Sequence, residues 1–518
     1  MKLNIKNIFI NELPADPDTE NSIRQVEKAV FSFVTPKKTA KSKVIHSSIE
    51  MASELGISTK EISSNYFKNI VTGNQVYPET KPYAMCYAGH QFGNWAGQLG
   101  DGRAINLFEV EHNSKNWKVQ LKGAGETPYS RNADGLAVLR SSIREYLCSE
   151  AMFHLGVPTT RALSLSLTGD QVMRDVLYDG NPALEKGAIV SRVAPSFLRF
   201  GNYEIFAARN DLKNLKILVD YTIKYHFPNI DSSSKEGYIN FFKYVSNRTL
   251  EMIIHWQRVG FVHGVMNTDK MSILGLTIDY GPYGWLEDFN FGWTPNTTDN
   301  QNKRYRYGNQ PNIGLWNLHQ LANALYPLIE EAKPLEDILN QYKVDFKIKS
   351  LQMMQSKLGL FTNDDDDLNL IQQLEDNLHL EETDMTIFFR LLSDFTDLPS
   401  SLEIMSAAVY KSNNIPKDFK KKWENWFSLY SKRLLKESFS HRQRKQKMDA
   451  INPKYVLRNY MAQLAIESAN EEDYSLIDEL FQLLKNPYSE QPKNQKWFAK
   501  SPEWARDKVG CSTLSCSS

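Results

Sequence analysis

The run INLFEVEHNSKNWKVQLK, residues 105–122, decides the predicted fold, because it reads as two strands joined by a turn. Apolar and polar residues alternate over 105–110 and again over 117–122, and the polar stretch 112–116 separates the two runs. Alternation with a period of two is typical of half-buried strands. The stretch therefore predicts an antiparallel hairpin whose second strand ends at Lys122.

An amphipathic helix is predicted shortly after the hairpin. Apolar residues recur at helical spacing from Leu139 to Phe153, and Pro158 ends the pattern. This helix carries Glu145. In protein kinases a strand lysine pairs with a helix carboxylate, which holds the ammonium group over the nucleotide phosphates. Lys122 and Glu145 fit this arrangement, although an exposed lysine and a surface glutamate are an equally good interpretation of the pair alone.

A loop with kinase-like order follows a long apolar helix predicted over 238–259. The string HGVMNTDKMSIL begins at His263, and Asp279-Tyr280-Gly281 follows it at the place of the kinase D-F-G motif. Val265 stands where kinases have the catalytic aspartate. The nearest carboxylate in the loop is that of Asp269, which could equally cap a turn.

A glycine-rich turn, GQLGDGRA, precedes the first strand of the hairpin at residues 97–104. Backbone amides in such a turn can approach a phosphate, and Arg103 adds a cation beside them. Most glycine-rich turns beside strands are purely structural, so this signal is weak on its own.

The composition excludes several classes of protein. Among the 518 residues, 61 Lys+Arg balance 61 Asp+Glu, whereas nucleic-acid binders draw much of their affinity from clustered basic residues. Mean hydropathy is −0.47, and no apolar stretch approaches the ~20 residues of a membrane-spanning helix. We expect no nucleic-acid partner and no membrane partner. The N-terminus shows no secretory apolar core, so we also expect a cytoplasmic location.

The chain is long enough for two to four domains of ~150 residues each. We expect an N-terminal extension over 1–80, an α+β core of two kinase-like lobes over 81–345, and a mostly helical region over 346–518. Glycine and aromatic residues become frequent from Tyr83, and strand patterns fade beyond about residue 315, where helical patterns such as 316–325, 419–434 and 455–468 begin.

Five longer strings strongly resemble the selenoprotein O family of protein adenylyltransferases. They are YAGHQFGNWAGQLGDGRA (from Tyr87), LKGAGETPYSRNADGLAVLRSSIREYL (from Leu121), SRVAPSFLRFGNYE (from Ser191), HGVMNTDKMSILGLTIDYGPYGWLEDF (from His263) and NQPNIGLWNLHQLA (from Asn309). The resemblance implies a kinase-like fold that binds ATP in a flipped orientation. The exposed α-phosphate would then let AMP move to Ser, Thr or Tyr hydroxyls of proteins, with UTP as a further candidate donor.

The resemblance also implies roles for individual residues. Asp269 matches the proton acceptor of the family, and Asp279 matches a nucleotide-binding and metal-binding aspartate for Mg²⁺ or Mn²⁺. Glu145 would support Lys122. The remaining nucleotide-binding positions of the family match Gly100, Gly102, Arg103, Lys122, Asp134, Gly135, Arg192 and Arg199.

Lys270 departs from the family pattern, which has an asparagine metal ligand directly after the proton acceptor. A protonated lysine cannot coordinate Mg²⁺. Its ammonium could instead take the vacated charge site and neutralise phosphate, or it could repel the metal and leave a protein that turns over poorly. We expect weakened metal affinity, because a cation a few ångströms from a divalent ion is repelled.

The C-terminal residues GCSTLSCSS resemble the family tail, in which selenocysteine or cysteine stands near the end. Cys516 occupies that place, and Cys511 lies five residues before it. A redox-sensitive disulfide and two inert thiols are equally open interpretations.

The function predicted from sequence is protein adenylylation with ATP as co-substrate and protein hydroxyls as acceptors. Two alternatives remain. An ordinary phosphotransferase would transfer the γ-phosphate, and a nucleotide-binding pseudoenzyme or scaffold, favoured by Lys270 and Val265, would bind ATP without covalent transfer.

Overall fold

The computed structural model describes residues 1–176, 178–231, 234–410, 417–512 and 514–515. Within them the largest sheet has eight strands, ordered β1-β3-β6-β7-β10-β9-β2, with β8 paired to β10. All of these pairs are antiparallel. The strands are β1 (Phe31–Phe33), β2 (Lys43–Ser47), β3 (Tyr83–Met85), β6 (Ala104–His112), β7 (Lys115–Lys122), β8 (Ala137–Val138), β9 (Arg161–Arg174) and β10 (Ala183–Ala194).

The predicted hairpin is confirmed as β6 and β7, with Ile105 opposite Leu121. Both strands are longer than the alternating runs, because the turn is confined to Asn113 and Ser114. These two residues have φ values of 49° and 59°, as the two-residue hairpin turns that match strand twist require. The polar residues beside the turn continue the ladder at its solvent-exposed end.

The first 80 residues belong to the same sheet. They supply β1 at one end of the strand order and β2 at the other. Four short helices accompany these strands, namely α1 (Ile8–Glu12), α2 (Ile49–Glu54), α3 (Thr59–Ile62) and α4 (Asn65–Val71). The sheet is therefore bounded by segments that precede its central hairpin in sequence.

The helix after the hairpin is α5 (Leu139–His154), and it is buried on nearly all sides. Every residue from Ser142 to Met152 is buried, because β9 and β10 cover one side and two C-terminal helices, α16 (Asn459–Asn470) and α17 (Ser475–Leu484), cover another. The sequence predicted an amphipathic helix here. The polar residues of α5, Glu145 among them, are instead buried with partners.

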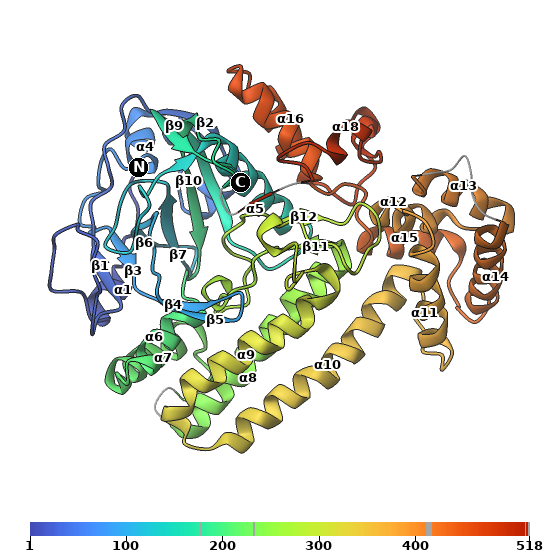
Figure 1. The fold of residues 1–518 in the computed structure, drawn as a ribbon, viewed down its shortest axis with the longest axis horizontal. Coiled ribbons are helices and arrows are strands. Elements are labelled where there is room, and N and C mark those ends of the chain that lie inside the picture. Colours follow the sequence, from blue (N-terminus) through green and yellow to red (C-terminus); the bar gives the residue numbers. More distant parts are fainter. Residues whose placement is uncertain (177, 232–233, 411–416, 513, 516–518) are drawn as a thin grey trace.

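A group of long helices lies beside the sheet in Figure 1. It consists of α6 (Phe200–Ala208), α7 (Leu212–His226), α8 (Lys235–Val259), α9 (Gln310–Ile329) and α10 (Ala332–Leu358). Gly260 ends α8 with a φ of 73°, a left-handed cap that glycine adopts without steric cost. The chain then enters β11 (Phe261–Val262), which pairs with β12 (Gly284–Trp285). This pairing closes the loop that carries Asp269 and Asp279.

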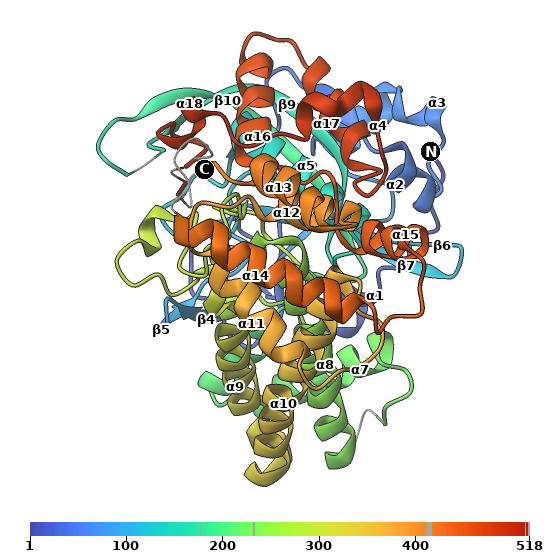
Figure 2. The ribbon, with the colours of Figure 1, turned by 90° about the vertical axis from the view of Figure 1, so that its right-hand side faces the viewer.

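The C-terminal helices form two groups. The first has a hydrophobic core of its own, built largely from residues 354–448, and it faces the viewer in Figure 2. It contains α11 (Asp367–Leu378), α12 (Met385–Leu391), α13 (Leu398–Ala408), α14 (Lys417–Leu434) and α15 (His441–Ile451). The second group, α16, α17 and α18 (Glu503–Arg506), returns to the main core around α5. None of the helices described is both long and apolar enough to cross a membrane.

Candidate active site

The expected lysine–glutamate contact is present. Lys122, at the end of β7, places its Nζ 2.6 Å from Oε2 of Glu145 on α5, and both side chains are largely buried. The pKa of Lys122 is lowered to about 8, chiefly by burial, which Glu145 opposes and which the neighbouring cations Arg103 and Arg192 reinforce. The ammonium is thus a positioned charge with few water molecules around it.

Arg192 links this pair to the loop of Asp279. It lies on β10 directly opposite Gln120 of β7, and its Nη2 donates to the Gln120 side-chain oxygen. Its Nη1 donates to Glu145 Oε1 at 3.0 Å and to Asp279 Oδ1 at 2.5 Å. The sheet register therefore places Lys122 and Arg192 side by side against one carboxylate of α5.

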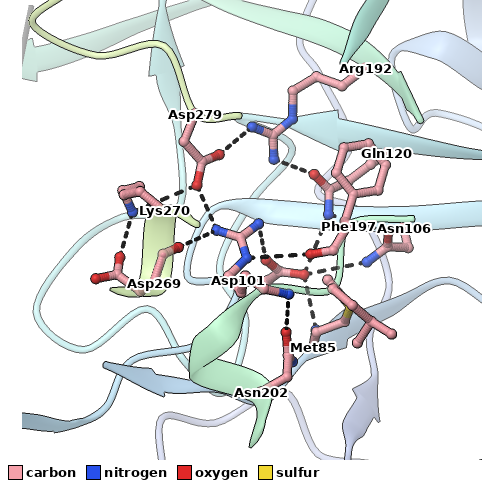
Figure 3. A network of polar contacts seen from close by, with 12 residues as sticks. Met85, Asp101, Asn106, Gln120, Arg192, Phe197, Asn202, Asp269, Lys270 and Asp279 are labelled. Atoms are coloured by element: carbon pink, nitrogen blue, oxygen red, sulfur yellow. Dashed lines mark hydrogen bonds and ion pairs between the residues drawn. The ribbon is translucent and has the colours of Figure 1, made fainter. Parts of the chain in front are cut away.

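Arg199 approaches Asp279 from the other side. Residues 198–200 pair with 271–273 through backbone hydrogen bonds, which fixes Arg199 beside the loop. Its Nη1 donates to Asp279 Oδ2 at 2.5 Å and to the backbone oxygen of Asp269 at 2.9 Å. Figure 3 shows the Asp279 carboxylate between Arg192 and Lys270. Burial alone would raise the pKa of Asp279, but Arg199, Arg192 and Lys270 hold it well below its usual range.

Asp269 and Lys270 occupy the short 3₁₀ turn Thr268–Lys270. The Lys270 ammonium lies 2.6 Å from Asp269 Oδ2 and 3.6 Å from Asp279 Oδ2. The other carboxylate oxygen of Asp269, Oδ1, is buried and has no hydrogen-bond partner among the described residues. Asp269 is thus fixed through one oxygen and free to accept a proton through the other.

Two buried donors near Asp279 also lack hydrogen-bond partners in the described structure. They are Arg199 Nη2, which lies 4.0 Å from an Asp101 oxygen, and Arg192 Nε. A buried polar group without a hydrogen bond costs free energy, roughly 1–3 kcal/mol, and calls for an explanation. Donors of this kind suit an anionic ligand that arrives at the site.

Backbone amides of the glycine-rich turn are already hydrogen-bonded within the protein. The amides of Leu99, Asp101 and Gly102 already donate to backbone carbonyl oxygens at 2.8–2.9 Å. A Cβ on Gly100 would lie 2.3 Å from the Tyr129 ring, so the packing against this ring itself requires glycine. These amides are not free for a phosphate, which leaves the side chain of Arg103 as the cation this turn offers.

Asp134 and Gly135 lie on the neighbouring loop, away from the network around Asp279. Asp134 is paired with Arg174 at 2.8 Å and is 41% exposed. A Cβ on Gly135 would lie 2.2 Å from the backbone of Gly125. The structure accounts for both residues by contacts within the protein, and their nucleotide-binding role stays a prediction.

Several residues of the network were not singled out from sequence. Asp101, between the two glycines, accepts hydrogen bonds from Asn106 and Gln120 at 3.3 and 3.4 Å. Gln120 points to the same side of β7 as Lys122, so the strand period could have identified it. Asp101 gave no such signal, because the sequence does not reveal that the turn folds against the centre of the sheet.

The donor groups do not fit a divalent ion bound by the protein between Asp269 and Asp279. In the described residues no three His, Cys, Asp or Glu side chains converge. Both oxygens of Asp279 already accept from guanidinium groups, and the Lys270 ammonium lies between the two carboxylates. An ion there would be repelled by that ammonium with an energy on the order of several kcal/mol. Asp279 as a metal ligand stays a prediction.

Of the two tail cysteines, Cys511 lies within the described residues. Cys511 is buried, and burial raises the pKa of its thiol to about 11. A thiol in that state reacts slowly at neutral pH. Cys516 lies outside the described residues.

Comparison with known proteins assigns the chain to a family. The family model described as "Protein adenylyltransferase SelO" matches residues 16–485. Relatives named protein nucleotidyltransferase YdiU include one from Flavobacterium johnsoniae, 62% identical, with 100% of this chain and 99% of the relative aligned. Others are from Rhodopirellula baltica, 51% identical with 100% and 99% aligned, and Aromatoleum aromaticum, 50% identical with 99% of each aligned.

Proposed function

We propose, from the premise that this chain belongs to the SelO family of protein adenylyltransferases, that it moves AMP from ATP to Ser, Thr or Tyr hydroxyls of other proteins. Membership makes the chain a protein nucleotidyltransferase. The observation that carries the finer assignment is the set of buried groups without partners: two guanidinium donors, on Arg192 and Arg199, and one acceptor, on Asp269. Donors suit phosphate oxygens, and the acceptor suits a hydroxyl group.

The triphosphate lies between the sheet and the helices, in the two-lobed arrangement typical of kinases. Lys122 and Arg103 meet it from the sheet, while Arg192 and Arg199 meet it at the greatest depth. Guanidinium groups bind phosphate through two parallel donors, and a desolvated site strengthens each contact. The β- and γ-phosphates are held deepest, and the α-phosphate faces Asp269. UTP is a second candidate donor, because none of these contacts selects a base.

The reaction is an in-line displacement at the α-phosphorus. The acceptor hydroxyl oxygen forms a bond to phosphorus, the bond from the α-phosphorus to the bridging oxygen breaks, and pyrophosphate leaves with that oxygen. Asp269 Oδ1 takes the hydroxyl proton. Positioning and charge neutralisation supply most of the rate, because this chemistry asks little covalent work of the protein.

Mg²⁺ or Mn²⁺ enters as the ion complexed to ATP, that is, as part of the co-substrate. Asp279 holds Arg192 and Arg199 in place for the phosphates. The use of ATP is consistent with a reaction in the cytoplasm.

The test uses ATP labelled at either the α- or the γ-phosphate, incubated with the full chain and a mixture of acceptor proteins. We expect the acceptor proteins to become labelled only when the label is on the α-phosphate. Asp269→Asn should reduce transfer by about 100-fold or more, the usual range for loss of a general base, while ATP still binds. Asp337→Asn, an exposed aspartate on α10, is the matched control. Label from the γ-phosphate, or transfer unchanged in Asp269→Asn, would contradict the proposal.

A further inference from the structure

We propose that the Lys270 ammonium is a built-in cation that stands in for a protein-bound divalent ion at the Asp269–Asp279 pair. This chain would then bind nucleotide phosphates with little need for metal held by the protein. The inference rests on the proposed function only in taking a nucleoside triphosphate as the ligand.

The position of the ammonium supports this inference first. Its distances of 2.6 Å to Asp269 Oδ2 and 3.6 Å to Asp279 Oδ2 place one positive charge between two carboxylates. The two residues come from different parts of one loop, and Lys270 links them (Figure 3). A bridging metal ion would do the same work, since it too relieves the repulsion between neighbouring carboxylates.

The charges of the ion-paired side chains around Asp279 are balanced. Lys122, Arg192, Arg199 and Lys270 stand against the four carboxylates of Asp101, Glu145, Asp269 and Asp279, all within a chain of ion pairs. Within this chain of ion pairs the positive and negative side chains are equal in number, and Arg103 adds a further cation beside Lys122. The network therefore has no excess of negative charge to attract a divalent ion, and asparagine in place of Lys270 would make its charge one unit more negative.

Lys270 is the more exposed of the two cations that contact Asp279 Oδ2. Its side chain is 25% exposed, whereas that of Arg199 is 1% exposed. An ammonium group has three donors, and its contacts with the two carboxylates use two of them. Lys270 is thus less deeply buried than Arg199, and its remaining donor suits a phosphate oxygen.

Two measurements on the full chain without acceptor protein test the inference. The first is Mn²⁺ binding to the nucleotide-free protein, followed by the electron paramagnetic resonance signal of free Mn²⁺. We expect Lys270→Asn to bind Mn²⁺ at least tenfold more tightly than the unchanged protein. The control Lys333→Asn, on an exposed lysine of α10, should behave like the unchanged protein.

The second is calorimetric ATP binding with EDTA and with Mn²⁺. The unchanged protein and Lys270→Arg should lose less than threefold in affinity when EDTA removes the metal, whereas Lys270→Met should lose tenfold or more. Equal Mn²⁺ affinity in the unchanged protein and Lys270→Asn would overturn the inference. So would a tenfold loss of ATP affinity in EDTA for the unchanged protein, a result that needs no variant to fold.

These readouts are independent of AMP transfer. A chain that binds ATP without metal but transfers no label would refute the proposed function and leave the role of Lys270 standing. If the unchanged protein transferred AMP but bound Mn²⁺ as tightly as Lys270→Asn does, the proposed function would stand and the role of Lys270 would be refuted.

Discussion

Lys122 experiences two opposing influences, and their balance makes the site sensitive to pH. Burial favours the neutral amine, and Glu145 at 2.6 Å favours the ammonium. The outcome is a pKa of about 8, below the ordinary value of 10.5. At a pH between these two values the amine is mostly neutral in the folded protein, although it would be charged in an unfolded chain. At pH 7 it is charged and ready for phosphate.

We predict that ATP binding takes up a proton above pH 8. Phosphate stabilises the ammonium, so a neutral Lys122 must gain a proton as ATP binds, and affinity should fall by up to about tenfold per pH unit above pH 8. Calorimetry in buffers of different ionisation enthalpy measures this uptake at pH 8.5. Lys122→Arg should abolish it, because a guanidinium group stays charged. Equal uptake in the variant would assign the proton to another group.

The sequence identified the site residues that belong to contiguous motifs and missed those supplied by folding. Lys122, Glu145 and Asp279 were recognised by motif order and residue type. Gln120 accepts a hydrogen bond from Arg192, and Asp101 lies 4.0 Å from Arg199. In the sequence, however, Gln120 is marked only by its place in a strand pattern, and Asp101 only by the glycines around it. The partners of a buried charge depend on which turn folds against which strand, and that is not a local property.

At the scale of elements, the turn before β6 shows how packing decides the role of a glycine. Gly97 and Gly100 both have positive φ values, 67° and 81°. A Cβ on Gly97 would meet nothing within 4 Å, whereas one on Gly100 would lie 2.3 Å from the Tyr129 ring. The same motif thus contains one glycine required by its backbone alone and one required by its neighbour as well.

We predict that Gly100→Ala is markedly more destabilising than Gly97→Ala. The backbone conformation costs each variant about 1–2 kcal/mol, and overpacking against Tyr129 adds about 1–3 kcal/mol to Gly100→Ala alone. Urea unfolding followed by tryptophan fluorescence measures the difference. Equal losses of unfolding free energy in the two variants would show that the ring moves aside freely.

Element boundaries were predictable only where local signals mark them. The hairpin and α8 agree closely with their patterns because a two-residue turn and a glycine cap delimit them. Residues 455–468 were expected to be one helix, yet α16 begins at Asn459, because Arg458 has an extended backbone with a ψ of 149° and its amide donates to the Val456 carbonyl at 2.9 Å. A tight turn of this kind leaves no trace in the apolar pattern.

At the scale of the whole molecule, both ends of the sequence enclose its middle. The N-terminal residues add both outer strands of the sheet, and α16 and α17 cover α5, which carries Glu145. From the sequence, these segments were predicted to be an N-terminal extension and a separate helical region. Residues at one sheet edge or on the outer side of α5 are distant in sequence from the partners that bury them, so the apolar pattern could not assign them.

One buried ion pair connects the separate helical core to the rest of the molecule. Arg458, just before α16, donates to both oxygens of Asp384 at 2.7 and 2.9 Å, and the two side chains are 3% and 0% exposed. Asp384 also caps α12 by accepting from the Ile387 amide at 3.0 Å. The pair therefore joins the start of α12, in one helical group, to the start of α16, in the other.

We predict that Arg458→Met destabilises the attachment of the helical core by about 3–5 kcal/mol, because it leaves a buried carboxylate without its partner. Unfolding of a chain with two cores need not be two-state, so amide hydrogen exchange in α12 is the decisive readout, and protection there should fall more than in β6 and β7. Lys333→Met removes an exposed ion pair on α10 and should change protection by less than ~0.5 kcal/mol. If α12 and the central strands lost protection equally, the two cores would unfold as one unit, and the ion pair would stabilise the whole molecule rather than the junction.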